Sequence, residues 1–139
     1  MPQLPDDTYR PAVVVKRSTT GLGLYAAEDI PKEQLIIEYT GEKITDEEAN
    51  RRANRYLFEI NDQWTLDGSD HKHTGRYINH SCRPNAEAEL DEEEERIYIR
   101  ARKRIKTGQE ITYDYGKDHF DEYIKPNGCR CEKCRVRSD

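Results

Sequence analysis

The sequence predicts a mainly β fold, a β-rich α+β domain of short strands with a single helix. Two observations lead to this prediction. Short runs of β-branched and aromatic residues recur along the chain, separated by glycine, proline, asparagine and aspartate turns. Only one segment carries the polar start pattern of a helix. With 139 residues, of which 34% are hydrophobic and 37% charged, the chain suits one domain with a modest core.

Three strands are expected in the first third of the chain. The VVV run places one at Pro11–Lys16, because consecutive valines suit a pleated strand better than a helix. After a polar loop comes the stretch GLG at 21–23, which lies between two predicted strands, where glycines most often mark turns. The second and third strands are predicted at Leu24–Ala27 and Gln34–Tyr39.

The one predicted helix follows. Thr45 with Glu48 three residues later is a capping-box pattern, which predicts a helix from Asp46 to about Asn54. Two further strands are expected at Tyr56–Ile60 and Trp64–Asp67, which contain aromatic and aliphatic residues and are separated by a turn at Asn61-Asp62.

The C-terminal half predicts a hairpin and one more strand. Ala86–Leu90 and Arg96–Arg100 flank the acidic run Asp91–Glu95, which is expected to be a solvated tip that also discourages edge-to-edge association. Glu110–Tyr115 is the last predicted strand, after a Thr-Gly turn.

The charge balance excludes several classes of function. The net charge is -5 and no basic stripe is evident, so direct nucleic-acid binding is not expected. An acidic surface favours cationic partners, including lysine-rich peptides. The chain starts without a signal pattern and contains no run near the ~20 apolar residues of a membrane span, so we expect a soluble intracellular protein, cytoplasmic or nuclear. The sequence leaves the oligomeric state open.

Gly21-Leu22-Gly23-Leu24-Tyr25-Ala26 matches the letters of a dinucleotide-binding fingerprint. That fingerprint needs a helix to begin at the glycines, whereas here Pro31 and a predicted strand follow. A dinucleotide site is therefore excluded. Two interpretations remain, an ordinary glycine turn and a stretch whose missing side chains let the backbone lie against a ligand.

The stretch RYINHSCRPN, residues 76–85, concentrates amides, an imidazole and a thiol in a span too irregular for a plain strand. One interpretation is a nucleophile pair in which Cys82 attacks and His80 is the base. The alternative is structural, an Asx-type turn with the histidine satisfied by the backbone.

Further on, Tyr113 and Tyr115 are two residues apart, so they are expected on one face of a strand, where packing alone would explain them.

The cysteines indicate a metal. Three of the four fall in the run CRCEKC at 129–134, and this clustering in a reducing compartment favours a metal over disulfides. A closed zinc site has four ligands, and the fourth cysteine, Cys82, lies far upstream. Four free thiols are the alternative.

In order along the chain, these stretches resemble the SET-domain protein lysine methyltransferases. The matching pieces are TTGLGLYA, EYTGE, YLFEI, RYINHSCRPNA and GQEITYDYG, followed by the cysteine tail. The resemblance divides the chain into an N-terminal extension (1–12), a SET domain (13–119) and a post-SET-like zinc-binding tail (120–139). It implies short curled sheets with a C-terminal pseudoknot, and transfer of a methyl group from S-adenosylmethionine to a lysine side chain of a protein, with histones the commonest target. The rival within the same fold is a catalytically silent module that binds a peptide or the cofactor.

The resemblance also assigns roles to residues. Tyr115 matches the catalytic tyrosine, and Tyr113 matches the position that tunes how many methyl groups are added, with tyrosine there favouring mono-methylation. The positions that match contacts to S-adenosylmethionine are Thr20, Gly21, Leu22, Gly23, Tyr56, Asn79 and His80. The positions that match a structural Cys₄ zinc site are Cys82, Cys129, Cys131 and Cys134. The tail spacing here is C-x-C-x2-C, shorter than the family's usual C-x-C-x4-C. No separate reader domain is evident, so substrate recognition is expected from the SET surface. Asp118, Asp121 and Glu122 could pair with a basic peptide there; the alternative, and the more common outcome, is an ordinary solvated face.

Overall fold

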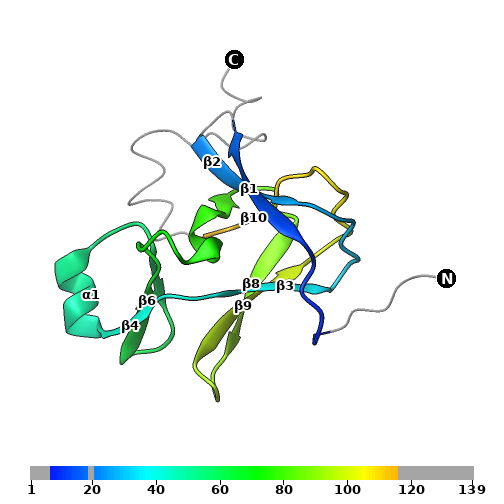
Figure 1. Cartoon of the computed structure of the whole chain (residues 1–139). Coiled ribbons are helices and arrows are strands. Elements are labelled where there is room, and N and C mark those ends of the chain that lie inside the picture. The colour runs from blue at the N-terminus through cyan, green and yellow to red at the C-terminus, as the bar shows by residue number, and fades with distance from the viewer. Residues whose placement is uncertain (1–6, 19–20, 116–139) are drawn as a thin grey trace.

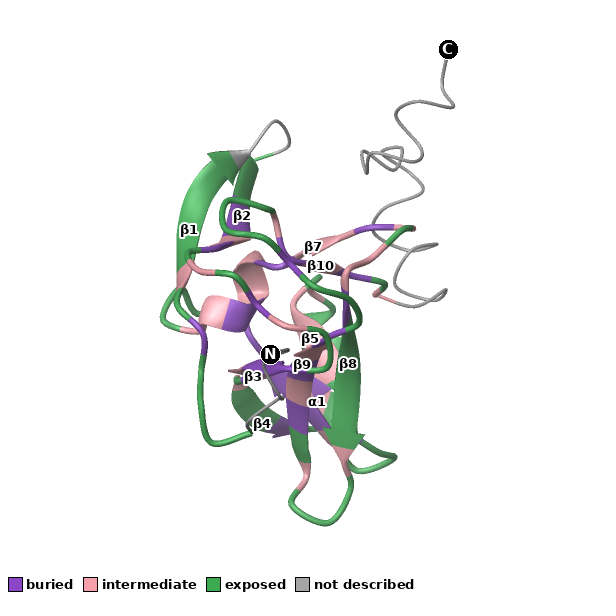
Figure 2. Cartoon of the chain, turned by 90° about the vertical axis from the view of Figure 1, so that its right-hand side faces the viewer, coloured by how far each residue is buried: buried purple, intermediate pink, exposed green. Residues whose placement is uncertain are grey.

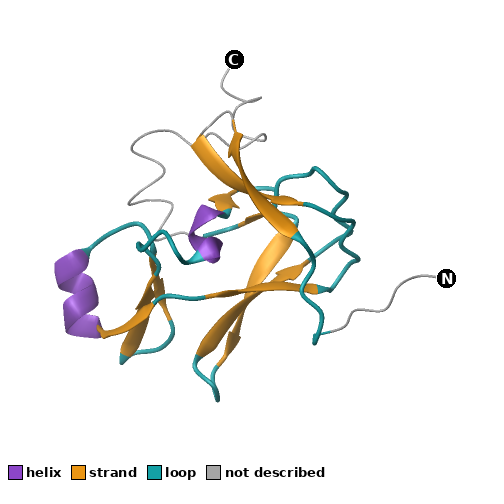
Figure 3. Cartoon of the chain, in the orientation of Figure 1, coloured by secondary structure: helices purple, strands orange, loops and turns teal. Residues whose placement is uncertain are grey.

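The structure is a computed structural model that describes residues 7–18 and 21–115 (Figure 1). These residues form ten short strands, one α-helix and one 3-10 helix. Figure 3 shows that strands predominate over helices, which confirms the mainly β prediction. The elements are β1 Val13–Ser18, β2 Gly21–Ala26, β3 Leu35–Tyr39, β4 Glu42–Thr45, α1 Asp46–Arg52, β5 Leu57–Glu59, β6 Trp64–Asp67, η1 Thr74–Tyr77, β7 Asn79–His80, β8 Ala86–Asp91, β9 Arg96–Ala101 and β10 Thr112–Tyr113. No helix in the described ranges is long and apolar enough to cross a bilayer.

Strands β1 and β2 form an antiparallel ribbon in register from Val13↔Ala26 to Ser18↔Gly21. Of the two interpretations of the GLG stretch, the ordinary glycine turn is therefore wrong, because both glycines lie inside β2. The other edge of β2 receives the C-terminal part of the described chain. The N–H of Ile111 donates to the carbonyl of Leu24 over 2.8 Å, and the N–H of Ala26 donates to Gln109 over 2.9 Å.

The predicted hairpin is confirmed as β8 and β9, paired from Ala86↔Ala101 to Asp91↔Arg96. Strand β3 pairs with the other edge of β9, which gives a three-stranded sheet in the order β3-β9-β8. At the acidic tip Glu92–Glu94 are exposed as expected. Glu95 instead accepts hydrogen bonds from Lys43, at 3.0 Å, and from Asn61, so the tip contacts a neighbouring sheet.

That neighbouring sheet is β4-β6-β5, which carries the helix (Figure 1). As predicted, Thr45 caps α1: its hydroxyl accepts the backbone N–H of Glu48 at 3.2 Å. The helix ends earlier than expected, because Ala53 adopts a left-handed conformation with φ 43°. Arg52 then joins α1 to the sheet through an ion pair with the buried carboxylate of Asp67 at 2.9 Å.

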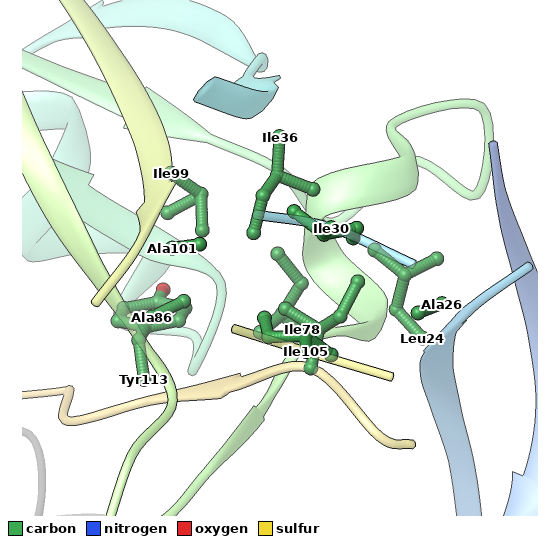
Figure 4. Packing of buried hydrophobic residues seen from close by; sticks show 11 residues of the cluster. Leu24, Ala26, Ile30, Ile36, Ile78, Ala86, Ile99, Ala101, Ile105 and Tyr113 are labelled. Atoms are coloured by element: carbon green, nitrogen blue, oxygen red, sulfur yellow. The ribbon is translucent and has the colours of Figure 1, made fainter. Parts of the chain in front are cut away.

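Two apolar clusters hold the sheets together. The larger lies between β2, η1, β9 and the C-terminal strand, as the sticks in Figure 4 show. Its buried members are Leu24, Ala26, Ile30, Ile36, Ile78, Ala86, Ile99, Ala101, Ile105, Ile111 and Tyr113. Burial of each large aliphatic side chain contributes about 1.5–3 kcal/mol to folding. The burial colours of Figure 2 show β1 as mostly exposed, whereas β2 is exposed at its start and buried at Gly23, Leu24 and Ala26.

The smallest sheet, β10-β7, carries three of the predicted site residues, Asn79, His80 and Tyr113. Strand β10 pairs in parallel with β7, with Thr112 opposite Asn79 and Tyr113 opposite His80. This pairing joins the RYINHSC and YDYG motifs, as the resemblance implied. Strand β10 is shorter than the predicted strand 110–115, and β7 was not predicted.

Candidate active site

The site is built where the C-terminal segment lies between β2 and the stretch 79–85. Asn85 holds this segment from one side. Its Nδ2 donates to the carbonyl of Glu110 at 2.8 Å, and its Oδ1 accepts the backbone N–H of Thr112 at 2.9 Å. Ser81 adds a backbone bond to the carbonyl of Tyr113 at 3.2 Å. The two motifs are therefore fixed relative to each other by the backbone as well as by side chains.

Asn79 links the site to β2. Its Nδ2 donates to the carbonyl of Leu22 at 2.9 Å and to Oε2 of Glu110 at 2.7 Å. Gly23 makes this approach feasible: a Cβ on it would lie 2.4 Å from Oε2 of Glu110 and 3.2 Å from Nδ2 of Asn79. The second glycine of the GLG stretch is thus required by close approach rather than by a turn. Gly21 has φ +121°, a conformation that favours glycine.

His80 stands between the catalytic candidates and the cysteine. Its side chain is only 6% exposed. Nδ1 accepts the backbone N–H of Tyr115 at 3.1 Å, and Nε2 lies 3.4 Å from Sγ of Cys82. Since a backbone N–H can only donate, the neutral ring carries its proton on Nε2 and directs it at the sulfur.

This tautomer argues against a Cys–His nucleophile pair. A general base needs a free lone pair facing the thiol, whereas Nε2 of His80 faces Cys82 with its proton. The structural alternative fits better. The imidazole is satisfied by the backbone at Tyr115, and Oγ of Ser81 accepts the N–H of Arg83 at 3.0 Å in a local turn.

Tyr113 and Tyr115 lie together, with ring centroids 4.8 Å apart, but β10 ends at Tyr113, so the prediction that one strand carries both is wrong. The hydroxyl of Tyr115 donates to the carbonyl of Ile78, and its ring packs edge-on against His80. Burial raises the pKa of Tyr115 and of Tyr113 above the ordinary value for tyrosine. Both hydroxyls therefore stay protonated at neutral pH, and neither is suited to act as a general base.

Sequence reasoning missed the residues that support these tyrosines. Tyr39 is buried, packs against Phe58 at 5.2 Å between ring centroids, and donates its hydroxyl to the carbonyl of Tyr56 at 2.8 Å. Phe58 in turn stacks on Tyr113 at 6.3 Å. Glycines leave room for Tyr39, because a Cβ on Gly68 would lie 2.8 Å from its hydroxyl oxygen. The sequence does show Tyr39 as the aromatic residue of the EYTGE stretch, but no local pattern indicates that it packs beneath the site.

Tyr56 lies at the rim of the aromatic group. The guanidinium of Arg76 stacks over its ring at 4.2 Å and over the ring of Tyr77 at 5.0 Å. Arg76 is held there because its Nε donates to the carbonyl of Gly68 at 3.2 Å. Tyr56 is half-buried, so part of its surface remains open to a ligand.

Several predicted site residues lie outside the described ranges. They are Thr20, Cys129, Cys131, Cys134, Asp118, Asp121 and Glu122. Of the predicted zinc ligands only Cys82 is described; it is partly exposed and forms no disulfide with a described residue. Within the described ranges no group of three or more metal-ligating side chains is found.

Comparison with known proteins identifies the class to which this fold and site belong. Residues 21–116 match the SET domain family, so the chain belongs to it. Among curated relatives, human histone-lysine N-methyltransferase 2D is 44% identical over 126 residues, which cover 83% of this chain and 2% of that protein. Histone-lysine N-methyltransferase trr of Drosophila melanogaster is 40% identical, covering 83% of this chain and 5% of that protein.

A fungal relative and a solved structure agree. The H3 lysine-4 specific histone-lysine N-methyltransferase of Chaetomium globosum is 38% identical, covering 76% of this chain and 11% of that protein. A humanized Chaetomium thermophilum Polycomb Repressive Complex 2 bound to an inhibitor superposes with a TM-score of 0.70 at 36% identity, covering 78% of this chain and 15% of that one. This chain thus spans only a small part of the length of these relatives.

Proposed function

We propose that this chain is an S-adenosylmethionine-dependent protein lysine N-methyltransferase whose substrate is a basic, lysine-containing segment, with histone tails as the first candidates. The observation that supports it most is the parallel β7–β10 pair, which gathers Asn79, His80, Tyr113 and Tyr115 beside the glycines of β2. The relatives named above are histone-lysine methyltransferases, which supports the choice of histones and a nuclear site of action.

The reaction is one displacement. The lysine nitrogen forms a bond to the methyl carbon while the carbon–sulfur bond breaks, and the sulfonium becomes a neutral thioether. The attacking amine must first lose a proton to water, since free lysine has a pKa of about 10.4. A desolvated site beside a sulfonium lowers that pKa. The remaining contribution is alignment of the amine with the methyl carbon, which lowers the activation barrier by on the order of 7–11 kcal/mol when the attack geometry is held.

Tyr115 and Tyr113 supply that alignment. The hydroxyl proton of Tyr115 is taken by the carbonyl of Ile78, so its oxygen lone pairs are left to receive the polarised C–H groups of the transferred methyl. Tyr113 is buried, with 5% of the residue exposed, and its hydroxyl would hold a water where a methylated amine would otherwise need room. This arrangement favours mono-methylation.

A structural zinc completes the proposal. Cys82, Cys129, Cys131 and Cys134 would hold it, closing the tail beside the site. Cys82 suits this role because its thiol is accessible and the N–H of His80 points at its sulfur, an arrangement that stabilises a thiolate ligand. Zinc would supply order to the tail and takes no part in the displacement.

The test is a methyltransfer assay. The protein is incubated with S-adenosylmethionine and a panel of lysine-rich proteins that includes core histones, and mass spectrometry records methyl-sized increments. Increments lost in Tyr115→Phe would support the enzyme. Binding of S-adenosylmethionine without transfer to any substrate would favour the silent module. Absence of binding would overturn the proposal.

A further inference from the structure

Glu110 occupies a place that the roles assigned so far do not explain. It precedes β10, and its backbone is fixed on two sides, by a bridge to Tyr25 of β2 and by the amide of Asn85 on its carbonyl. With the backbone fixed, the side chain reaches back to the GLG stretch. There Oε2 accepts Nδ2 of Asn79 at 2.7 Å, a contact between residues 31 positions apart in the chain.

The hydrogen bonds of Asn79 determine which way its amide faces. The NH₂ group has two protons, and they are taken by the carbonyl of Leu22 and the carboxylate of Glu110. The flipped amide would place its oxygen against two acceptors, which is repulsive. Of the two partners, only Glu110 is a carboxylate, and hydrogen bonds to ionised acceptors are about twice as strong as neutral ones. Glu110 therefore contributes most to fixing the flip state.

With both N–H groups of Asn79 used in this way, its amide oxygen remains available to accept a hydrogen bond. In the part of the chain that the structure describes, Oδ1 of Asn79 takes part in no hydrogen bond, and the residue is only half-buried. This oxygen lies on the opposite branch of the planar amide from the locked NH₂ group. A carboxylate behind the amide polarises it and makes the oxygen a better acceptor for a cation.

The absence of a side chain at Gly23 leaves room for the carboxylate of Glu110 to reach Asn79. Any side chain there would strike the carboxylate, with a Cβ only 2.4 Å from Oε2 and 3.1 Å from Cδ of Glu110. Gly23 lies mid-strand without a positive φ, so close approach explains it where backbone conformation does not.

We propose that Glu110 is a positioning residue for the methyl donor: it locks the amide of Asn79 so that Oδ1 faces the cationic α-ammonium group of the amino-acid end of S-adenosylmethionine. This inference rests on the proposed function and specifies how the site distinguishes its ligand. Glu110 makes ligands with an amino-acid end bind more tightly than adenosine thioethers that lack it.

Calorimetry with two probes tests the inference. S-adenosylhomocysteine carries the amino-acid end, and methylthioadenosine shares the adenosine and the sulfur but lacks that end. In Glu110→Ala the dissociation constant for S-adenosylhomocysteine is expected to rise about 10- to 100-fold, while that for methylthioadenosine stays within about threefold. Glu110→Gln keeps one acceptor oxygen and is expected to lose less than Glu110→Ala for S-adenosylhomocysteine.

The ratio of the two constants distinguishes positioning from general damage. Partial unfolding lowers the apparent affinity for both probes equally and leaves the ratio unchanged. An unchanged ratio in both variants would overturn the positioning role, even if Glu110→Ala were poorly folded. If the unaltered protein binds neither probe, it is the proposed methyltransferase function that fails.

Discussion

The backbone N–H of Tyr115 donates to Nδ1 of His80 at 3.1 Å, and the opposite ring nitrogen of His80 lies 3.4 Å from Sγ of Cys82. One imidazole thus spans the distance between the predicted catalytic tyrosine and the predicted first zinc ligand. Because the ring is 94% buried as a side chain, it cannot adjust to one partner without moving against the other. The position of Tyr115 and the conformation of the NHSC turn are therefore coupled.

The hydroxyl of Tyr115 is expected to be needed for turnover and dispensable for cofactor binding. Tyr115→Phe keeps the ring packing against His80 and Tyr113 but removes the oxygen held by Ile78. We expect kcat to fall about 100-fold or more, with the affinity for S-adenosylhomocysteine nearly unchanged. Tyr98→Phe, which removes a hydroxyl from a half-buried tyrosine on β9, is the matched control. Normal turnover in Tyr115→Phe would contradict the role assigned to it.

Tyr113 is expected to limit how many methyl groups are added. Its hydroxyl is buried close to Tyr115, and Tyr113→Phe frees the volume of the oxygen and of any water it holds. We expect mono-methylated product in the unaltered protein and di- or tri-methylated product in the variant, read by mass spectrometry at matched turnover. The prediction is wrong if both proteins give the same product distribution.

Acid is expected to lower the stability of the protein by protonating Asp29. The backbone N–H of Thr107 at 2.9 Å, the guanidinium of Arg104 and the hydroxyl of Thr107 lower the pKa of Asp29 to about 2. Its pKa in the unfolded chain is about 3.9, so its stabilising contribution is present above that pH and is lost as pH falls through about 2. Neighbouring Ile30 pairs with Ile105, so protonation of Asp29 also weakens the attachment of the segment that leads to β10.

Urea unfolding as a function of pH measures this effect. Asp29→Asn is expected to be less stable than the unaltered protein at neutral pH, and the difference should shrink as the solution is acidified. Asp62→Asn, at an exposed aspartate with no ion pair among the described residues, should follow the unaltered protein throughout. A difference for Asp29→Asn that is independent of pH would show that packing, and not ionisation, is responsible.

Local patterns predicted the elements that local interactions form. Thr45 and Glu48 specify the start of α1 within one turn, and the β8–β9 hairpin follows from two alternating runs around a polar tip. For the GLG stretch the sequence left a turn and a close approach to a ligand open, because the reason for Gly23 lies in Glu110, far along the chain. Hydrophobic periodicity and local turn patterns cannot reveal a contact between residues so far apart in the chain.

The same limit applies to the candidate site. The motif residues were named from their resemblance to a family, yet Glu110, Asn85 and Tyr39 were not, although they hold the motif in place. Strand β7 has two residues and pairs in parallel with β10, so neither alternation nor length could predict it. The contacts that hold the site together join residues 17, 25 and 31 positions apart, and they become visible only in the folded chain.

Removal of zinc is expected to abolish activity without unfolding the sheets. Zinc–thiolate binding contributes on the order of 10 kcal/mol to ordering a segment, whereas the apolar clusters of the described domain contain no cysteine. We expect zinc equimolar with the chain by elemental analysis, loss of activity on chelation, and recovery when zinc is restored. Cys82→Ser should bind zinc weakly and stay inactive when zinc is added. Full zinc content in Cys82→Ser would exclude Cys82 as a ligand.

Gly23→Ala is expected to destabilise the protein through a single steric conflict. The added Cβ would lie 2.4 Å from Oε2 of Glu110, so the carboxylate must move away from Asn79. Overpacking of this kind costs about 1–3 kcal/mol of unfolding free energy. The double variant Gly23→Ala/Glu110→Ala removes the conflict and should regain most of that stability in urea unfolding, yet bind S-adenosylhomocysteine no better than Glu110→Ala. If the double variant is as unstable as Gly23→Ala, the conflict lies elsewhere on β2, and the close approach of Glu110 does not explain the glycine.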